Sequence, residues 1–289
     1  MTAAAVNLDD KYALQQGTIY ITGSQALVRL PMMQLARDRA NGLNTGCFIS
    51  GYRGSPMHNF DKELWRAKRF LDGGHIHFQP AVNEDLAATS LWGSQQTGLM
   101  AESRYDGVFG IWYGKGPGLD RSMDAIRHAN LAGTSPHGGV LAVVGDDHGM
   151  ASSDVPATSE PTFTDLLMPM LYPGNVQELL DLGLLGIALS RFCGAWVGVK
   201  AISDTLDAVA TVNVDTDAPR IIIPDFEFPP DGVHLREPDP WLEQEPRLRH
   251  FKMAAALAFA SANGLNRVVI KSRQPRFGII ANGKSTYDV

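Results

Sequence analysis

Apolar segments that end in glycine-rich loops recur through the N-terminal part of the chain. After each of these loops, which are rich in glycine or polar residues, apolar residues recur at the spacing of a helix. The segments are 45–50, 107–113 and 139–144, and their loops are 51–56, 114–118 and 145–149. A strand buried on both faces is apolar throughout, and strands that alternate with helices build a parallel sheet. The sequence therefore predicts a doubly wound α/β fold with a mainly parallel sheet, helices on both faces and functional loops at the carboxyl edge.

The other elements are predicted from the same periodicities. Helices are expected at residues 9–16, 23–41, 61–71, 83–102, 120–132, 175–192 and 247–262. Further strands or extended pieces are expected at 18–21, 75–79, 196–200, 212–214, 221–223, 267–271 and 277–283, and a first helical turn at 285–289. Residues 152–164, rich in Ser, Thr and Pro, are expected to be a loop, and residues 224–246, which carry six prolines, an irregular connector.

The regular alternation stops after residue 203, which suggests a division into three parts. We expect an α/β domain at 1–203, an irregular extension and connector with one helix at 204–275, and the start of a further domain at 276–289. The last part repeats the strand, turn and helix of the earlier units but contains only one helical turn. Because so short a helix cannot bury an apolar face, we expect the chain to be a fragment of a longer protein.

Composition and charge exclude several classes of function. The chain has 289 residues, of which 44% are hydrophobic and 19% charged, as is typical of a globular protein with one large or two small domains. A net charge of -6 and the absence of basic runs give no electrostatic footprint for DNA or RNA. No apolar stretch approaches the roughly 20 residues of a membrane span. Cys47 and Cys193 are too few for a disulfide framework or a zinc site, so the cytoplasm is the predicted location.

A carboxylate stands at the junction between the strand expected at 75–79 and the helix that follows it. Asn83 is a plausible N-cap, which places Glu84 in the first helical turn beside the carboxyl edge of the sheet. An acidic residue there complements the helix dipole and needs no further function. Position alone therefore leaves two readings of Glu84 open, as a helix-dipole residue or as a chemical group.

Two glycine-rich turns are candidates for ligand contact. In the first, the backbone around Gly54, Ser55 and Pro56 can approach an anion closely, and Arg53 adds charge. The second spans 114–118 and carries Lys115. Neither turn has the spacing of a P-loop, so binding of a nucleoside triphosphate is not indicated, and a pure turn role stays open for both.

Asp146, Asp147 and His148 have the side chains of a metal site. Three consecutive residues at the end of a strand point in different directions, however, and rarely reach one ion. We therefore predict no metal site from them and expect loop capping or ligand contact by one of the three. A metal-dependent or nucleotide-dependent hydrolase built on this loop remains an alternative.

Four motifs, taken together and in this order, carry a resemblance to a known family. They are 49–56 (ISGYRGSP), 78–89 (FQPAVNEDLAAT), 112–118 (WYGKGPG) and 137–148 (HGGVLAVVGDDH). They resemble the long, fused bacterial form of indolepyruvate ferredoxin oxidoreductase, within the thiamine diphosphate-dependent 2-oxo acid:ferredoxin oxidoreductases. The resemblance covers essentially the whole chain, and residues 277–285 resemble the start of a transketolase C-terminal-like domain.

The resemblance implies an enzyme that decarboxylates an aryl or branched 2-oxo acid, passes electrons through iron–sulfur clusters to ferredoxin, and releases an acyl-CoA. It also implies a homodimer. This chain would be its pyrimidine-binding domain, with Glu84 as the glutamate that hydrogen-bonds the aminopyrimidine ring nitrogen of thiamine diphosphate and promotes its imino tautomer. Ser55, Arg53 and Lys115 are expected near the substrate. Residues expected at the cofactor are Gly54, Pro56, Asn83, Gly116 and Gly118.

Features of a complete enzyme of this kind are missing from the sequence. Thiamine enzymes bind the diphosphate and Mg²⁺ through a separate domain with a G-D-G motif and a distant Asn, and residues 145–147 do not fit that pattern. Cysteines for iron–sulfur clusters are also absent. We therefore expect those sites outside this chain, and we expect the chain alone to be inactive. A non-catalytic dimerisation or regulatory module of the same fold is the alternative from another class.

Overall fold

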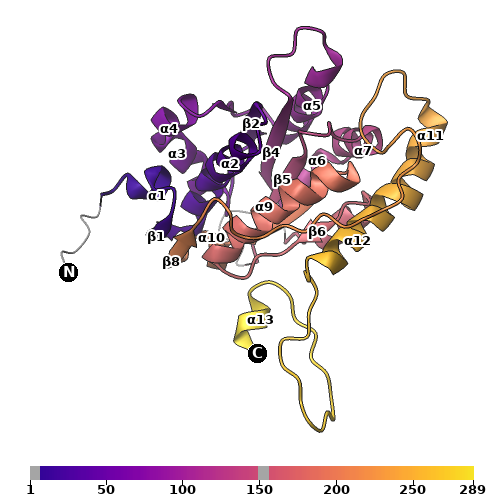
Figure 1. The fold of residues 1–289 in the computed structure, drawn as a ribbon. Helices are drawn as coiled ribbons and strands as arrows, with labels where there is room; N and C mark the ends of the chain where they lie inside the picture. Colours follow the sequence, from indigo (N-terminus) through magenta and orange to yellow (C-terminus); the bar gives the residue numbers. More distant parts are fainter. Residues whose placement is uncertain (1–6, 149–155) are drawn as a thin grey trace.

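A six-stranded parallel sheet forms the centre of the protein in a computed structural model, which describes residues 7–148 and 156–289. The strand order is β3-β2-β4-β5-β7-β6, and every neighbouring pair is parallel. The strands of this sheet are β2 (Thr45–Gly51), β3 (Ile76–Phe78), β4 (Gly107–Lys115), β5 (Val140–Asp146), β6 (Met170–Leu171) and β7 (Val197–Ile202). Helices surround the sheet (Figure 1), which confirms the predicted α/β class.

The described residues contain more helices than the seven, with one further helical turn, that the sequence predicted. They are α1 (Asp10–Ala13), α2 (Gly23–Ala40), α3 (His58–Arg66), α4 (Lys68–Asp72), α5 (Glu84–Gln95), α6 (Gly116–Arg121), α7 (Met123–Ala132), α8 (Glu160–Asp165), α9 (Val176–Cys193), α10 (Ser203–Leu206), α11 (Trp241–Pro246), α12 (Met253–Ala262) and α13 (Ser285–Asp288). A 3₁₀ turn, Thr97–Leu99, follows α5, and a π-helical segment, Arg247–Lys252, joins α11 to α12.

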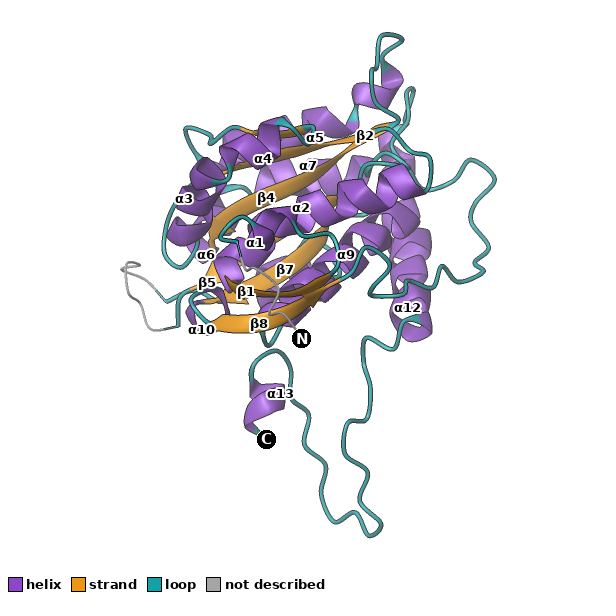
Figure 2. Ribbon diagram, turned by 60° about the vertical axis from the view of Figure 1, so that its left-hand side comes forward, coloured by secondary structure: helices purple, strands orange, loops and turns teal. Residues whose placement is uncertain are grey.

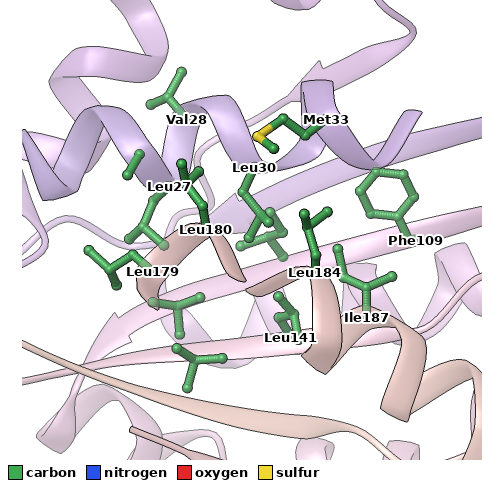
Figure 3. Close-up of a cluster of buried hydrophobic side chains, with 14 of the residues drawn as sticks. Leu27, Val28, Leu30, Met33, Phe109, Leu141, Leu179, Leu180, Leu184 and Ile187 are labelled. Atoms are coloured by element: carbon green, nitrogen blue, oxygen red, sulfur yellow. The ribbon is translucent and has the colours of Figure 1, made fainter. Parts of the chain in front are cut away.

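Helices cover both faces of the sheet and enclose two separate apolar cores. In β4, Phe109 and Ile111 point into the core under α2 and α9, whereas Trp112 points into the core under α5 and α7. Figure 3 shows leucines of α2 and α9 meeting over the sheet. These helices approach closely at Gly183, where a Cβ would lie 2.6 Å from Leu30 Cδ2. Since each fully buried leucine contributes about 1.5–3 kcal/mol, this contact is a major source of stability.

The strand order reverses its direction at β2, the second strand of the sheet. The chain passes from β2 to β3 on one side and then returns to β4 on the other side. Ligands of open α/β sheets bind outside the carboxyl ends of the strands at such a reversal. The segments that leave β2 and β4 there are 51–56 and 114–118, the two glycine-rich turns of the sequence. The loop predicted at 114–118 was wrong, because these residues form the end of β4 and the start of α6 with no loop between them.

A two-stranded antiparallel ribbon links distant parts of the chain. It pairs β1 (Gly17–Thr22) with β8 (Val209–Val214), so that Gly17 lies opposite Val214. The strands predicted at 18–21 and 212–214 are thereby confirmed and extended. The division of the chain into three domains stays a prediction.

Several predicted bounds in the first half of the chain were wrong. The helix expected at 83–102 ends at Gln95, next to Gly93 and Gly98, because glycine weakens a helix interior. The helix expected at 61–71 is split into α3 and α4. The helix expected at 120–132 begins earlier, with α6, and is interrupted before α7.

Two segments expected to be irregular contain helices. The end of the loop predicted at 152–164 is helical from Glu160 in α8, and its beginning lies outside the described residues. The end of the connector predicted at 224–246 forms α11. The two-residue strand β6 was not predicted, because two residues carry no periodic pattern.

The strands expected near the C-terminus do not form. Residues 221–223, 267–271 and 277–281 are assigned to no strand, and the segment 266–280 is exposed throughout. Figures 1 and 2 show the chain between α12 and α13 extending away from the helices and the sheet. An apolar segment forms a strand only when a neighbouring strand pairs with its backbone N–H and C=O groups. Within the described residues, none of these three segments has such a neighbour. The first helical turn expected at 285–289 is confirmed as α13.

Both cysteines, Cys47 in β2 and Cys193 at the end of α9, are free and buried.

Among the described residues, no helix combines the length and the apolar character needed to cross a lipid bilayer.

A buried ammonium group attaches the C-terminal helices to the α/β core. Lys252 is 0% exposed, and its Nζ donates to the carbonyls of Asn130 (3.2 Å) and Leu131 (3.0 Å) in the last turn of α7. It therefore satisfies carbonyls that the helix itself leaves without partners. Burial lowers the pKa of Lys252 to about 7 from its ordinary value of 10.5.

We expect the wild type to gain stability relative to Lys252→Met as the pH rises from about 7 to about 10.5. In this window the unfolded lysine holds a proton that the folded lysine has lost, so deprotonation favours the folded state. Urea unfolding of both proteins across this range measures the difference. Lys62→Met, at an exposed position of α3, should follow the wild type, and parallel curves for Lys252→Met would contradict the prediction.

Candidate active site

The N-terminus of α5 forms as the sequence predicts. Asn83 Oδ1 accepts a hydrogen bond from the amide of Leu86 at 2.8 Å, which makes Asn83 the N-cap and Glu84 the first helical residue. Trp112 Nε1 donates to the backbone carbonyl of Glu84 at 3.0 Å. The indole of β4 thereby fixes the first turn of α5 against the centre of the sheet.

The Glu84 side chain lies against the backbone of the second glycine-rich turn. A Cβ at Gly118 would be only 2.6 Å from both Cγ and Oε1 of Glu84, so no larger residue fits at 118 without displacing the glutamate. The side chain of Glu84 is only 7% exposed. Its position is therefore set by packing on both sides.

The carboxylate oxygens of Glu84 accept no hydrogen bond from the described residues. Among the described residues, no donor lies within hydrogen-bonding distance of its oxygens, and its one ionic contact is Arg121 Nη1, 3.8 Å from Oε2. A carboxylate in a mostly buried side chain has only limited contact with water, and here no protein donor replaces the water that it has lost. Such a group suits a site in which a ligand brings the donor.

The first glycine-rich turn lies beside this carboxylate site and is held by backbone contacts. The amide of Tyr52 donates to the carbonyl of Tyr113 at 3.1 Å, and the amide of Ala81 donates to the carbonyl of Gly51 at 3.0 Å. These bonds tie the end of β2 to β4 and to the segment that leads into α5. A Cβ at Gly145 would meet Pro56 Cδ at 2.7 Å, so the turn also packs on the end of β5.

The structure brings the two turns together at the predicted residues. A Cβ at Gly54 would lie 3.2 Å from Lys115 Cδ, so the lysine side chain crosses the first turn. Ser55 is buried and Arg53 is exposed within the same turn. The roles predicted for these residues at a substrate stay predictions.

Asp146 is part of a buried charged cluster. Its Oδ2 accepts from the amide (3.0 Å) and hydroxyl (2.9 Å) of Ser159 and lies 3.1 Å from Lys200 Nζ, which also contacts Glu160 at 2.5 Å. Burial alone lowers the pKa of Lys200, but its hydrogen bonds with Glu160 and Asp146 raise it overall. Asp146 therefore anchors the start of α8 to β7.

A metal site at 146–148 is not supported by this geometry. Asp146 is engaged by Lys200, Asp147 is buried and His148 is exposed. In the part of the chain that the structure describes, no group of three acidic, histidine or cysteine side chains is placed to hold a metal ion. Gly116 connects this cluster with the glutamate site, since a Cβ there would lie 3.4 Å from Asp146 Oδ1.

Three residues of this region were not predicted from the sequence. Trp112 stands in an apolar strand and was indistinguishable from other core residues. Lys200 is the one charge in the apolar segment 196–200, a signal that could have indicated a buried ion pair. Arg121 follows Gly118 by three residues, which on a helix places both on one face.

Comparison with solved structures finds similarity to the 2-oxoglutarate:ferredoxin oxidoreductase from Magnetococcus marinus, solved with 2-oxoglutarate, coenzyme A and succinyl-CoA bound. The TM-score is 0.52 at 16% sequence identity, and the match covers 84% of this chain and 46% of that chain. The present chain thus spans about half the length of that protein. At this identity, the likeness shows the fold alone. No protein-family profile and no curated protein matches the sequence.

We expect Gly118→Ala to lower the free energy of unfolding by about 1–3 kcal/mol, because the added methyl group would overlap the Glu84 side chain. Gly93→Ala is the matched control, since Gly93 lies in α5 with open space around it. That change should raise the stability by up to about 1 kcal/mol. Urea unfolding measures both, and equal stability of the two variants would contradict the packing of Glu84 on Gly118.

Proposed function

We propose that this chain is the pyrimidine-binding part of a thiamine diphosphate-dependent enzyme. The enzyme would oxidatively decarboxylate aryl, indolepyruvate-like 2-oxo acids to acyl-CoA and reduce ferredoxin. The likeness in fold to a 2-oxo acid:ferredoxin oxidoreductase supports the general class. The sequence motifs around 49–56, 78–89 and 112–118 support the aryl substrate.

The environment of the Glu84 carboxylate is the single observation on which this proposal rests. The carboxylate is nearly buried, it lies at the reversal point of the sheet, and the described part of the chain offers it no hydrogen-bond donor. The protonated ring nitrogen of an aminopyrimidine is a donor that fits this acceptor. The residues present therefore suit the ring of thiamine diphosphate.

Each residue around Glu84 has a definite task in this proposal. Glu84 holds a proton at Oε2 or shares it with the ring nitrogen, as a general acid–base group does. Gly118 leaves room for the Glu84 side chain, Gly116 lets the start of α6 pack beside Asp146, and Asn83 fixes the helix that carries Glu84. Thiamine diphosphate, when bound, supplies the carbon nucleophile and the electron sink for decarboxylation.

The substrate would meet the cationic side of the site. Arg53 and Lys115 supply positive charge for the carboxylate of a 2-oxo acid, and Ser55 supplies a hydroxyl group in the same turn. Gly54 and Pro56 shape that turn. These assignments rest on the resemblance of the motifs and on the contact between Gly54 and Lys115.

In this proposal, the groups that bind the diphosphate and Mg²⁺ belong to polypeptide outside this chain. The sequence lacks the G-D-G motif for Mg²⁺ and diphosphate and the cysteines for iron–sulfur clusters. A cytoplasmic homodimer that also binds coenzyme A and ferredoxin would complete the enzyme. The chain alone would then be inactive, because it holds the ring but not the diphosphate.

In an enzyme that contains this chain, Glu84→Gln should lower the rate of 2-oxo acid decarboxylation by at least about 100-fold, because an amide cannot relay a proton. Asp85→Asn, a change to the next carboxylate of the same helical turn, is the control and should retain activity. The chain alone, given thiamine diphosphate and Mg²⁺, should show no turnover. Near wild-type activity of Glu84→Gln would remove Glu84 from the mechanism and favour the non-catalytic module.

A further inference from the structure

The helix α6 carries two residues that meet Glu84 from one side. Oε1 and Cγ of Glu84 occupy the space that a side chain at Gly118 would need, and Arg121 reaches toward Oε2 from one helical turn further on. The two oxygens of the carboxylate are therefore distinguished. Oε1 lies against the backbone, and Oε2 faces the guanidinium group at the rim.

The backbone at Arg121 is held by its neighbour, whereas its side chain is mostly exposed. The next residue, Ser122, is fully buried, and its hydroxyl donates to the carbonyl of Gly118 at 2.8 Å. The side chain of Arg121 is 63% exposed and 3.8 Å from Oε2, longer than a hydrogen bond. Within residues 7–148 and 156–289, Glu84 is the one ionic partner of Arg121.

We propose that Arg121 is a positioning residue, the counter-ion of Glu84 in the ligand-free site, which withdraws when a ring nitrogen takes its place at Oε2. This inference rests on the proposed function. A guanidinium group and a protonated ring nitrogen carry the same charge and would seek the same oxygen. The two therefore compete, and the exposure of Arg121 provides the route by which it leaves.

This competition predicts the sign and size of the effect of removing Arg121. An ion pair with one exposed partner contributes about 0.2–1 kcal/mol, so its loss should tighten binding of the ring by up to about fivefold. A residue that only supported the fold would weaken binding when it is replaced. Whether the affinity for the ring rises or falls therefore distinguishes a counter-ion role of Arg121 from a structural role.

The test is an NMR-monitored titration of the 289-residue chain with the aminopyrimidine ring of thiamine, without its thiazolium and diphosphate. We expect Arg121→Gln to bind the ring about 1.4- to fivefold more tightly than the wild type, and Arg121→Lys to bind it as the wild type does. Arg127→Gln is the control, since Arg127 lies on α7 and pairs with Asp165. It should leave the affinity unchanged.

A second arm uses Glu84→Gln with and without Arg121→Gln. The effect of removing Arg121 should disappear in the Glu84→Gln background, because the carboxylate that it neutralises is gone. Unchanged or weaker binding by Arg121→Gln, with a wild type that binds through Glu84, would overturn the role of Arg121 alone. Equal binding of the ring by the wild type and Glu84→Gln, or none by either, would overturn the proposed function and this inference with it.

Discussion

The contact between the Glu84 side chain and the backbone of Gly118 is the constraint on which the candidate site depends. It holds one carboxylate oxygen against the chain and leaves the other toward the rim. The indole of Trp112 fixes the helical turn from the opposite side through the carbonyl of Glu84. The side chain is mostly buried and no donor of the described residues bonds its oxygens, which is unfavourable for folding, and functional sites are where proteins tolerate such a cost.

The topology of the sheet explains why these residues meet. The chain leaves β2 in one direction and returns to β4 on the other side, so the turns after both strands and the helix after β3 converge at one edge. Residues more than 30 positions apart in sequence, Glu84 and Gly118, are thereby placed in contact. Further along the same sheet, the buried ion pair of Asp146 and Lys200 joins the ends of β5 and β7.

Local signals in the sequence predicted the scaffold but only part of the site. The buried strands and the Asn83 cap follow from runs of apolar residues and from side-chain chemistry within one helical turn. Arg121 and Lys200 depend on contacts between distant segments, which periodicity does not encode. The strands expected at 267–271 and 277–281 were wrong for a related reason, since a strand requires a neighbour and the pattern alone does not supply one. The helix α8 begins within a Ser/Thr/Pro-rich segment whose composition favoured a loop.

In the proposed function, Glu84 offers its open oxygen to an aminopyrimidine ring. A crystal structure of the chain soaked with the aminopyrimidine of thiamine tests it most directly. We expect the ring beside Gly118, with its nitrogen about 2.7–2.9 Å from Glu84 Oε2 and Arg121 displaced from that oxygen. A ring bound elsewhere, or a ring at this edge of the sheet whose nitrogen does not face Glu84, would contradict the account.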